Sequence, residues 1–125
     1  MFKKLFGSSE PKEEKILPWI HLTSMIQLDE IAEKSKTKTQ LIFKHSTRCG
    51  ISRMVLNQFA DQYQLENNAD LYYLDLLNNR DVSNEVASKF QVIHQSPQLL
   101  ILNNGVVVAH DSHGAINELD LVKYI

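Results

Sequence analysis

The residues best suited to chemistry lie in one stretch, from Lys44 to Arg53, which holds Cys49, the only cysteine of the chain. An apolar run leads into this stretch and a helical pattern of apolar residues leads out of it. A cysteine between a strand and a helix lies where backbone N–H groups converge and the helix dipole favours negative charge. Lys44, Arg48 and Arg53 add positive charge nearby, as does His45 when protonated. Such surroundings lower the pKa of a thiol from about 8.5 toward neutrality and produce a reactive thiolate.

The alternative is a purely structural role, in which Cys49 is a small buried hydrophobic residue, as a lone cysteine usually is. One cysteine rules out an internal disulfide and a cysteine-based zinc site, and it is compatible with a reducing cytosol. We therefore expect a cytoplasmic protein. The segment His110-Asp111-Ser112-His113 resembles a metal cluster only superficially, because no third histidine lies near it in sequence, and we expect no metal.

Length and composition point to one ordinary globular domain. The chain has 125 residues, of which 43% are hydrophobic and 22% charged. A net charge of −2 argues against nucleic-acid binding, because no basic face is evident. No apolar run reaches the roughly 18 residues of a transmembrane helix. Residues 1–7 include two lysines but lack the apolar segment of a secretory signal, and residues 8–15 are polar with one proline. We therefore expect a flexible tail at 1–15 before a domain at 16–125.

Within residues 16–125 the apolar pattern predicts the order β-α-β-α-β-α-β-β-α. Leu41-Ile42-Phe43 reads as a strand buried on both faces, and Asn103-Asn104-Gly105 as a tight hairpin turn. Strands are expected at 16–22, 41–43, 71–76, 98–102 and 106–110, and helices after Thr23 or Ser24, from 51 to about 65, after Asp81 or Ser83, and from about 115. The helix residues expected to face inward are Ile26, Leu28, Ile31, Ala32, Ile51, Val55, Leu56, Phe59, Tyr63, Val82, Val86, Ala87, Phe90, Ile116, Leu119 and Val122. This order needs an α/β fold with a central mixed sheet flanked by helices.

Three features with matching spacing resemble the thioredoxin superfamily across nearly the whole ordered length. They are Cys49 at a helix start, Ser96-Pro97 before a strand, and the Asn104-Gly105 hairpin. The resemblance implies a thioredoxin-like fold in which the peptide before Pro97 is cis and faces Cys49. It also implies that Ser96 offers its backbone N–H and C=O groups to an extended substrate segment.

Within that superfamily, residues 42–49, which read IFKHSTRC, together with Ile51-Ser52 and Trp19, resemble the YtxJ-type monothiol bacilliredoxins. That family is associated with bacillithiol, the small thiol that replaces glutathione in some bacteria. Gly50 departs from the pattern, because better-known members have proline there. The resemblance implies a monothiol thiol–disulfide oxidoreductase that removes bacillithiol from S-bacillithiolated proteins through a Cys49 mixed disulfide. Bacillithiol, or another small thiol, is then a co-substrate, no cofactor is bound, and we expect a monomer.

Ser52 stands where a thioredoxin has its second cysteine. A hydroxyl cannot displace sulfur, so a mixed disulfide on Cys49 cannot resolve internally. We expect the Ser52 hydroxyl to donate a hydrogen bond to the Cys49 thiolate and lower its pKa further. Arg48 and Lys44 are candidates to bind the carboxylates of bacillithiol. We therefore expect a site that consists of catalytic Cys49 and Ser52 with substrate-binding Thr47, Arg48, Gly50, Ser96 and Pro97.

Two other functions stay open from the sequence. Cys49-Gly50-Ile51-Ser52 is similar to the C-G-F-S motif of monothiol glutaredoxins, which bind iron–sulfur clusters. The glycine pair with acidic residues that those proteins place after their hairpin is missing, since residues 111–114 read DSHG. An iron–sulfur carrier is therefore the second hypothesis. The third is a catalytically inactive thioredoxin-like interaction module whose Cys49 is a relic.

Overall fold

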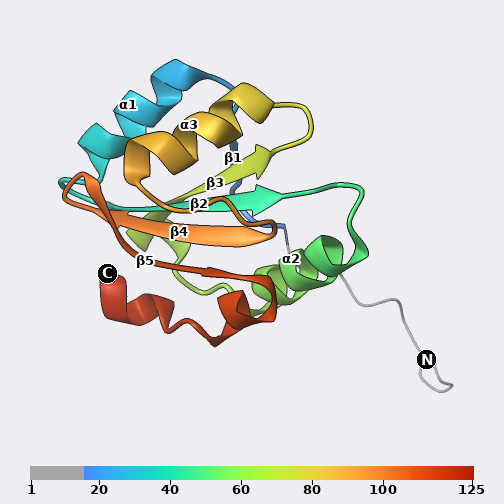
Figure 1. Cartoon of the computed structure of the whole chain (residues 1–125). Coiled ribbons are helices and arrows are strands. Elements are labelled where there is room, and N and C mark those ends of the chain that lie inside the picture. Colours follow the sequence, from blue (N-terminus) through green and yellow to red (C-terminus); the bar gives the residue numbers. More distant parts are fainter. Residues whose placement is uncertain (1–15) are drawn as a thin grey trace, which may run out of the picture.

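The computed structural model describes residues 16–125, so the tail predicted for residues 1–15 lies outside the described residues. Figure 1 shows a central sheet with α1 and α3 over one face and α2 with the C-terminal segment over the other. The strands are β1 (Ile20–His21), β2 (Thr39–His45), β3 (Ala69–Asp75), β4 (Gln98–Asn103) and β5 (Val106–Ser112). The helices are α1 (Met25–Lys34), α2 (Gly50–Gln62) and α3 (Arg80–Phe90), with short 3-10 helices at Glu66–Asn68, His113–Glu118 and Leu121–Tyr124.

The sheet has five strands in the order β1-β3-β2-β4-β5. Strands β1, β3 and β2 are parallel, and β4 and β5 add an antiparallel hairpin. All seven residues of the central strand β2 are buried. This confirms the predicted mixed sheet and a strand covered on both faces, although the strand is longer than the run 41–43 that predicted it.

Two apolar cores lie on opposite faces of the sheet. On the α2 face, the Phe43 ring packs 5.2 Å from Phe59 and 6.0 Å from Trp19 between centroids. The other core lies beneath α1 and α3; its helix residues are Leu28, Ile31, Val82, Val86 and Phe90. Tyr72 belongs to this second core, whereas the ring of Tyr73 packs 5.5 Å from Trp19 on the α2 face. Alternation along β3 thus sends adjacent tyrosines to opposite sides.

The hairpin between β4 and β5 forms as predicted. Asn104 and Gly105 have φ of 55° and 83°, the left-handed pair that a two-residue turn of the favoured twist requires. The Ser96–Pro97 peptide is cis, as the resemblance implied. None of the helices within residues 16–125 has the length and apolar character needed to cross a bilayer.

Several element boundaries and burial predictions are wrong. The first strand shrinks to two residues, and α3 begins at Arg80 with Asn79 as its N-cap in place of Asp81 or Ser83. The predicted last helix is replaced by two short 3-10 helices. Three residues expected to face inward are instead exposed, Ile26 at 70%, Ile51 at 55% and Val122 at 71%. Ile26 and Ile51 lie in the first turns of their helices.

Candidate active site

Cys49 lies just past the carboxyl end of β2 and is the N-cap of α2, with extended backbone at φ −108° and ψ 121°. Its N–H donates to the Ser46 carbonyl at 3.2 Å, and its own carbonyl accepts from the Arg53 N–H at 3.1 Å. The thiol therefore lies at the helix end whose N–H groups have no partners within the helix. Cys49 is partly exposed rather than buried. A small buried hydrophobic residue does not describe this position, and an incoming disulfide has access to the sulfur.

The Ser52 hydroxyl has two protein partners. Ser52 is fully buried, its Oγ accepts the Ser46 N–H at 3.1 Å, and it lies 2.8 Å from Nδ1 of His45. Burial lowers the pKa of His45; the Arg53 charge lowers it further and Asp75 opposes it. The imidazole is thus neutral at pH 7, and its Nδ1 lone pair can accept the Ser52 O–H. The hydrogen bonds found for Ser52 run to His45 and Ser46, not to the Cys49 thiolate as expected.

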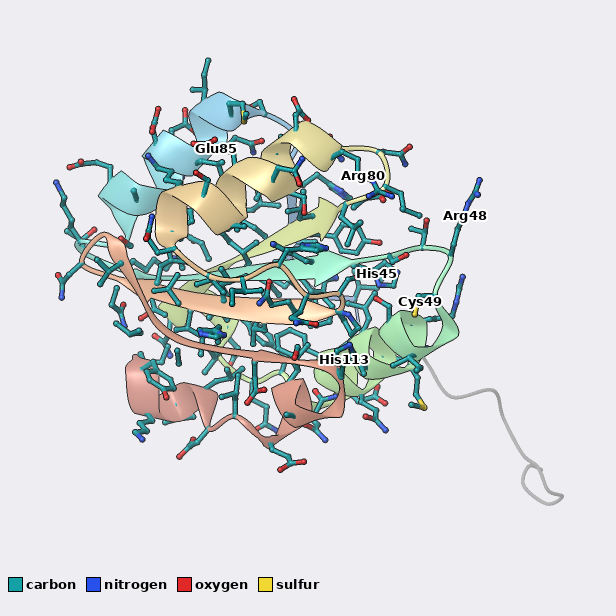
Figure 2. All side chains as sticks on the ribbon, in the orientation of Figure 1. His45, Arg48, Cys49, Arg80, Glu85 and His113 are labelled. Atoms are coloured by element: carbon teal, nitrogen blue, oxygen red, sulfur yellow. The ribbon has the colours of Figure 1, made fainter. Side chains whose placement is uncertain are left out.

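The positive charges predicted around Cys49 are distributed differently. Strand alternation turns Lys44 to the sheet face away from α2, where it is 0% exposed. A carboxylate in solvent cannot reach it, which corrects the predicted substrate contact of Lys44. Arg48 is exposed and points away from the body of the protein (Figure 2). Arg53 donates to the Thr47 carbonyl at 3.3 Å and ties the loop before Cys49 to α2.

Ser96 and Pro97 lie at the same edge of the sheet as Cys49. In the antiparallel pairing of β2 with β4, Lys44 is opposite Gln98, so Pro97 is placed next to the carboxyl end of β2. The Pro97 carbonyl accepts the His113 N–H at 3.1 Å, which joins the end of β5 to this edge. Within residues 16–125, the Ser96 Oγ is buried without a hydrogen-bond partner, and the Ser96 backbone makes none of the hydrogen bonds found. The Ser96 backbone groups therefore have no protein partner at this edge of the sheet.

Comparison with known proteins agrees with this geometry. A family model described as the monothiol bacilliredoxin BrxC matches residues 20–121. The chain belongs to the monothiol bacilliredoxin family. This confirms the resemblance drawn from Cys49, Ser52 and their neighbours, and it places the protein among thiol oxidoreductases of the thioredoxin superfamily.

Solved structures support the same assignment of the fold. One assigned as an oxidoreductase with a thioredoxin fold has 35% sequence identity and a TM-score of 0.72, over 85% of this chain and 92% of that one. The thioredoxin of Malassezia sympodialis has 17% identity and a TM-score of 0.65, over 82% and 84% of the two chains. The thioredoxin of Schistosoma mansoni has 21% identity and a TM-score of 0.62, over 86% and 95%. The last two likenesses concern the fold alone.

The remaining predicted residues of this bacilliredoxin lie in the loop around Cys49. Thr47 and Gly50 are both exposed beside the thiol. A Cβ added at Gly50 would meet nothing within 4 Å, so there is room for a small side chain at this position. Among the described residues, no group of three His, Cys, Asp or Glu gathers into a metal site, and His110 and His113 form none.

Sequence reasoning missed the roles of three residues at this edge of the bacilliredoxin. The sequence offers His45 as a positive charge or a packed ring, and alternation from Leu41 and Phe43 places it on the α2 face with Ser52. His94 and Gln98 belong to no motif in the sequence, yet both take part in hydrogen bonds that hold the segment before Ser96. Gln98 is a polar residue directly after Pro97, at the start of an otherwise apolar strand. This position indicates a buried polar side chain that needs hydrogen-bond partners.

Proposed function

We propose that this protein removes bacillithiol from S-bacillithiolated proteins by a cycle that uses Cys49 alone. The observation that carries the proposal is the pairing of a partly exposed Cys49 at the N-terminus of α2 with a buried serine one turn later. The nucleophile is accessible, and the position from which a second thiol would resolve it holds the Ser52 hydroxyl, which is hydrogen-bonded to His45 and Ser46.

In the first step, the Cys49 thiolate attacks the bacillithiol sulfur of a protein–bacillithiol mixed disulfide. A bond forms between the Cys49 Sγ and that sulfur, the old S–S bond breaks, and the substrate protein leaves as a thiolate that takes a proton. In the second step, the thiolate of a free bacillithiol attacks the same bacillithiol sulfur. Cys49 leaves as the thiolate, and oxidised bacillithiol is released. The net change converts the protein–bacillithiol disulfide and one free bacillithiol into a protein thiol and oxidised bacillithiol, so no resident cofactor is needed.

The surroundings of Cys49 supply recognition for both halves of this substrate. The exposed Arg48 side chain stands next to the thiol and is proposed to pair with the carboxylates of bacillithiol. The free backbone groups of Ser96 are proposed to bind the extended chain around the modified cysteine of the substrate. Ile51 and Ile93, 55% and 84% exposed, offer apolar contacts to a protein surface. We further propose that the protein acts in the cytoplasm and as a monomer.

Steady-state turnover tests the proposal. A protein bacillithiolated on one cysteine is incubated with catalytic amounts of the enzyme and an excess of bacillithiol, and release of the free protein thiol is followed. The same substrate carrying glutathione, with glutathione as the reductant, provides the comparison. Cys49→Ser should abolish turnover, and Arg48→Gln should raise the KM for the bacillithiolated substrate more than for the glutathionylated one. Turnover of neither substrate by the parent enzyme would overturn the proposal and favour an inactive module, and a coloured iron–sulfur protein after anaerobic reconstitution would favour the carrier.

A further inference from the structure

Two buried polar side chains stand side by side on neighbouring strands beneath the site. Lys44 of β2 and Gln98 of β4 are directly opposite in the antiparallel register, with 0% and 1% exposure. Residues opposite each other in such a pair project from the same face of a sheet. The apolar core covered by α1 and α3 lies on that face. Burial of polar side chains costs free energy unless they are hydrogen-bonded, so their partners indicate their purpose.

Between them, the two side chains contact three consecutive residues, Ile93 to Gln95, which lie between α3 and the Ser96–Pro97 edge. Lys44 Nζ lies 3.1 Å from Nδ1 of His94. Gln98 Nε2 donates to the Ile93 carbonyl at 3.0 Å, and its Oε1 accepts the Gln95 N–H at 3.4 Å. Three consecutive residues are thus each fixed by a buried side chain, and the next residue is Ser96.

The Lys44–His94 contact requires a neutral imidazole, because an ammonium group has donors and no acceptor. Burial lowers the pKa of His94, and the charges of Lys44 and Arg80 lower it further. His94 is exposed to solvent, so acid can protonate it and break the bond. Burial also lowers the pKa of Lys44, to about 8, which leaves most of the amine charged at pH 7. Among the described residues, no ion pair includes Lys44, and its side chain contacts His94 alone through a hydrogen bond.

We propose that Lys44 and His94 are positioning residues, which hold the segment before Ser96 so that its backbone groups face the disulfide partner of Cys49. The proposal deepens the proposed function, on which it rests for the identity of that partner. The free energy of folding alone does not explain why Lys44 and His94 are paired here. Replacing a buried charged residue with an apolar residue of similar size often leaves stability unchanged or raises it. The pair also lies on the sheet face away from α2, so it acts on substrate binding and leaves the chemistry of the Cys49 thiol unchanged.

Three variants test the pair. Lys44→Met removes the amine and keeps most of the volume; His94→Leu removes the acceptor; and His94→Asn keeps an acceptor that acid does not protonate. Lys36→Met and His110→Leu are matched controls, because Lys36 and His110 are exposed and lie outside the site. For the bacillithiolated protein, Lys44→Met and His94→Leu should raise KM about fivefold, the factor expected for one lost hydrogen bond, with His94→Asn closer to the parent.

The pH profile separates positioning from a merely structural role. Because the pKa of His94 is lowered, KM for the bacillithiolated protein should rise in the parent enzyme only at pH values below the ordinary histidine range, and this rise should be absent in His94→Asn. The rate at which iodoacetamide alkylates Cys49 should be equal in all forms. A KM unchanged in both Lys44→Met and His94→Leu, or an equal loss in the two controls, would overturn the proposal.

Hydrogen exchange keeps the test independent of the proposed activity. The amides of residues 93–96 should exchange faster in Lys44→Met and His94→Leu than in the parent at pH 7, while amides of β2 and β4 stay protected. The parent could turn over no bacillithiolated substrate while residues 93–96 still exchange faster in the variants. The proposed function would then be wrong, but the conclusion that Lys44 and His94 fix this segment would stand. Unchanged exchange rates at residues 93–96 would show that Lys44 and His94 do not fix this segment, whether or not the enzyme is active.

Discussion

The Ser52 hydroxyl of α2 lies 2.8 Å from Nδ1 of His45, the last residue of β2, and also accepts the Ser46 N–H. This relationship joins the start of the helix to the end of the strand directly behind Cys49. The position that would carry a resolving thiol is therefore built as a buried hydrogen-bonded link. A one-thiol cycle follows from it, and so do specific effects of substitutions at Ser52.

Ser52→Ala should destabilise the protein by about 1–3 kcal/mol, because the Ser46 N–H and His45 Nδ1 would be left buried without a partner. Ser83→Ala is the matched control: Ser83 is 2% exposed, and its Oγ has no hydrogen-bond partner within residues 16–125. Removing the Ser83 hydroxyl should leave the free energy of unfolding unchanged or raise it slightly. Urea denaturation of the two variants measures the difference, and equal free energies of unfolding would show that the link between Ser52 and His45 carries no stability.

Ser52→Cys should convert the one-thiol cycle into a two-thiol cycle. Residues three apart in the first turn of a helix lie within the Cα separation that a disulfide allows. After one turnover, the introduced thiol should attack the Cys49 mixed disulfide and release bacillithiol without a second small thiol. Mass spectrometry should then show an internal disulfide, lost again in the double variant with Cys49→Ser. A stable bacillithiol adduct on Cys49 in Ser52→Cys would contradict this expectation.

Lys44→Met should stabilise the protein at pH 7. A pKa of about 8 in place of 10.5 corresponds to about 3 kcal/mol against the charged form, which is the upper limit of the gain. The folded state binds fewer protons at Lys44 than the unfolded state between these pH values, so the parent should gain stability as the pH rises from 8 to 10. Lys44→Met should lack that gain. A variant that loses several kcal/mol at pH 7 would show that the amine stabilises the fold.

Gly50→Ala should stabilise the protein by about 0.4–1 kcal/mol, because Gly50 is helical and a Cβ there meets nothing within 4 Å. Gly105→Ala provides the contrast, since Gly105 has φ of 83° and a side chain there is strained. Gly50→Pro should also fold, because the first helical position needs no N–H partner. The midpoints of thermal denaturation rank the stabilities of the variants and the parent. A lower midpoint for Gly50→Ala than for the parent would contradict the predicted stabilisation.

The fold was predictable from sequence wherever one short pattern decides a structure. The apolar run 41–43 predicted a doubly buried strand, and Asn104-Gly105 a hairpin, because each depends on its own residues. The last helix was not predictable: Ile116, Leu119 and Val122 are spaced by three, which suits a 3-10 helix as well as an α-helix. Leu119 is extended in the structure and separates two short 3-10 helices.

At the site, the sequence predicts that Cys49 and the Ser96–Pro97 segment lie at one edge of the sheet. It does not identify the side chains that hold them there through hydrogen bonds. The partners of Ser52 depend on which face His45 takes at the end of β2, and those of Lys44 on the loop that crosses the opposite face. Such contacts join segments far apart in the chain, and charge counts along the sequence cannot place them. Lys44 looked like part of a cationic site because it is near Cys49 in sequence, whereas the sheet separates the two.

A single-turnover mass measurement tests the one-thiol cycle most directly. The enzyme is mixed with an equal amount of a protein carrying one bacillithiol, no free thiol is added, and the intact masses of both proteins are followed. The substrate should lose bacillithiol as the enzyme gains one on Cys49, and the adduct should persist until bacillithiol is added and regenerates the thiol. No adduct on Cys49 while the substrate keeps its bacillithiol would contradict the cycle.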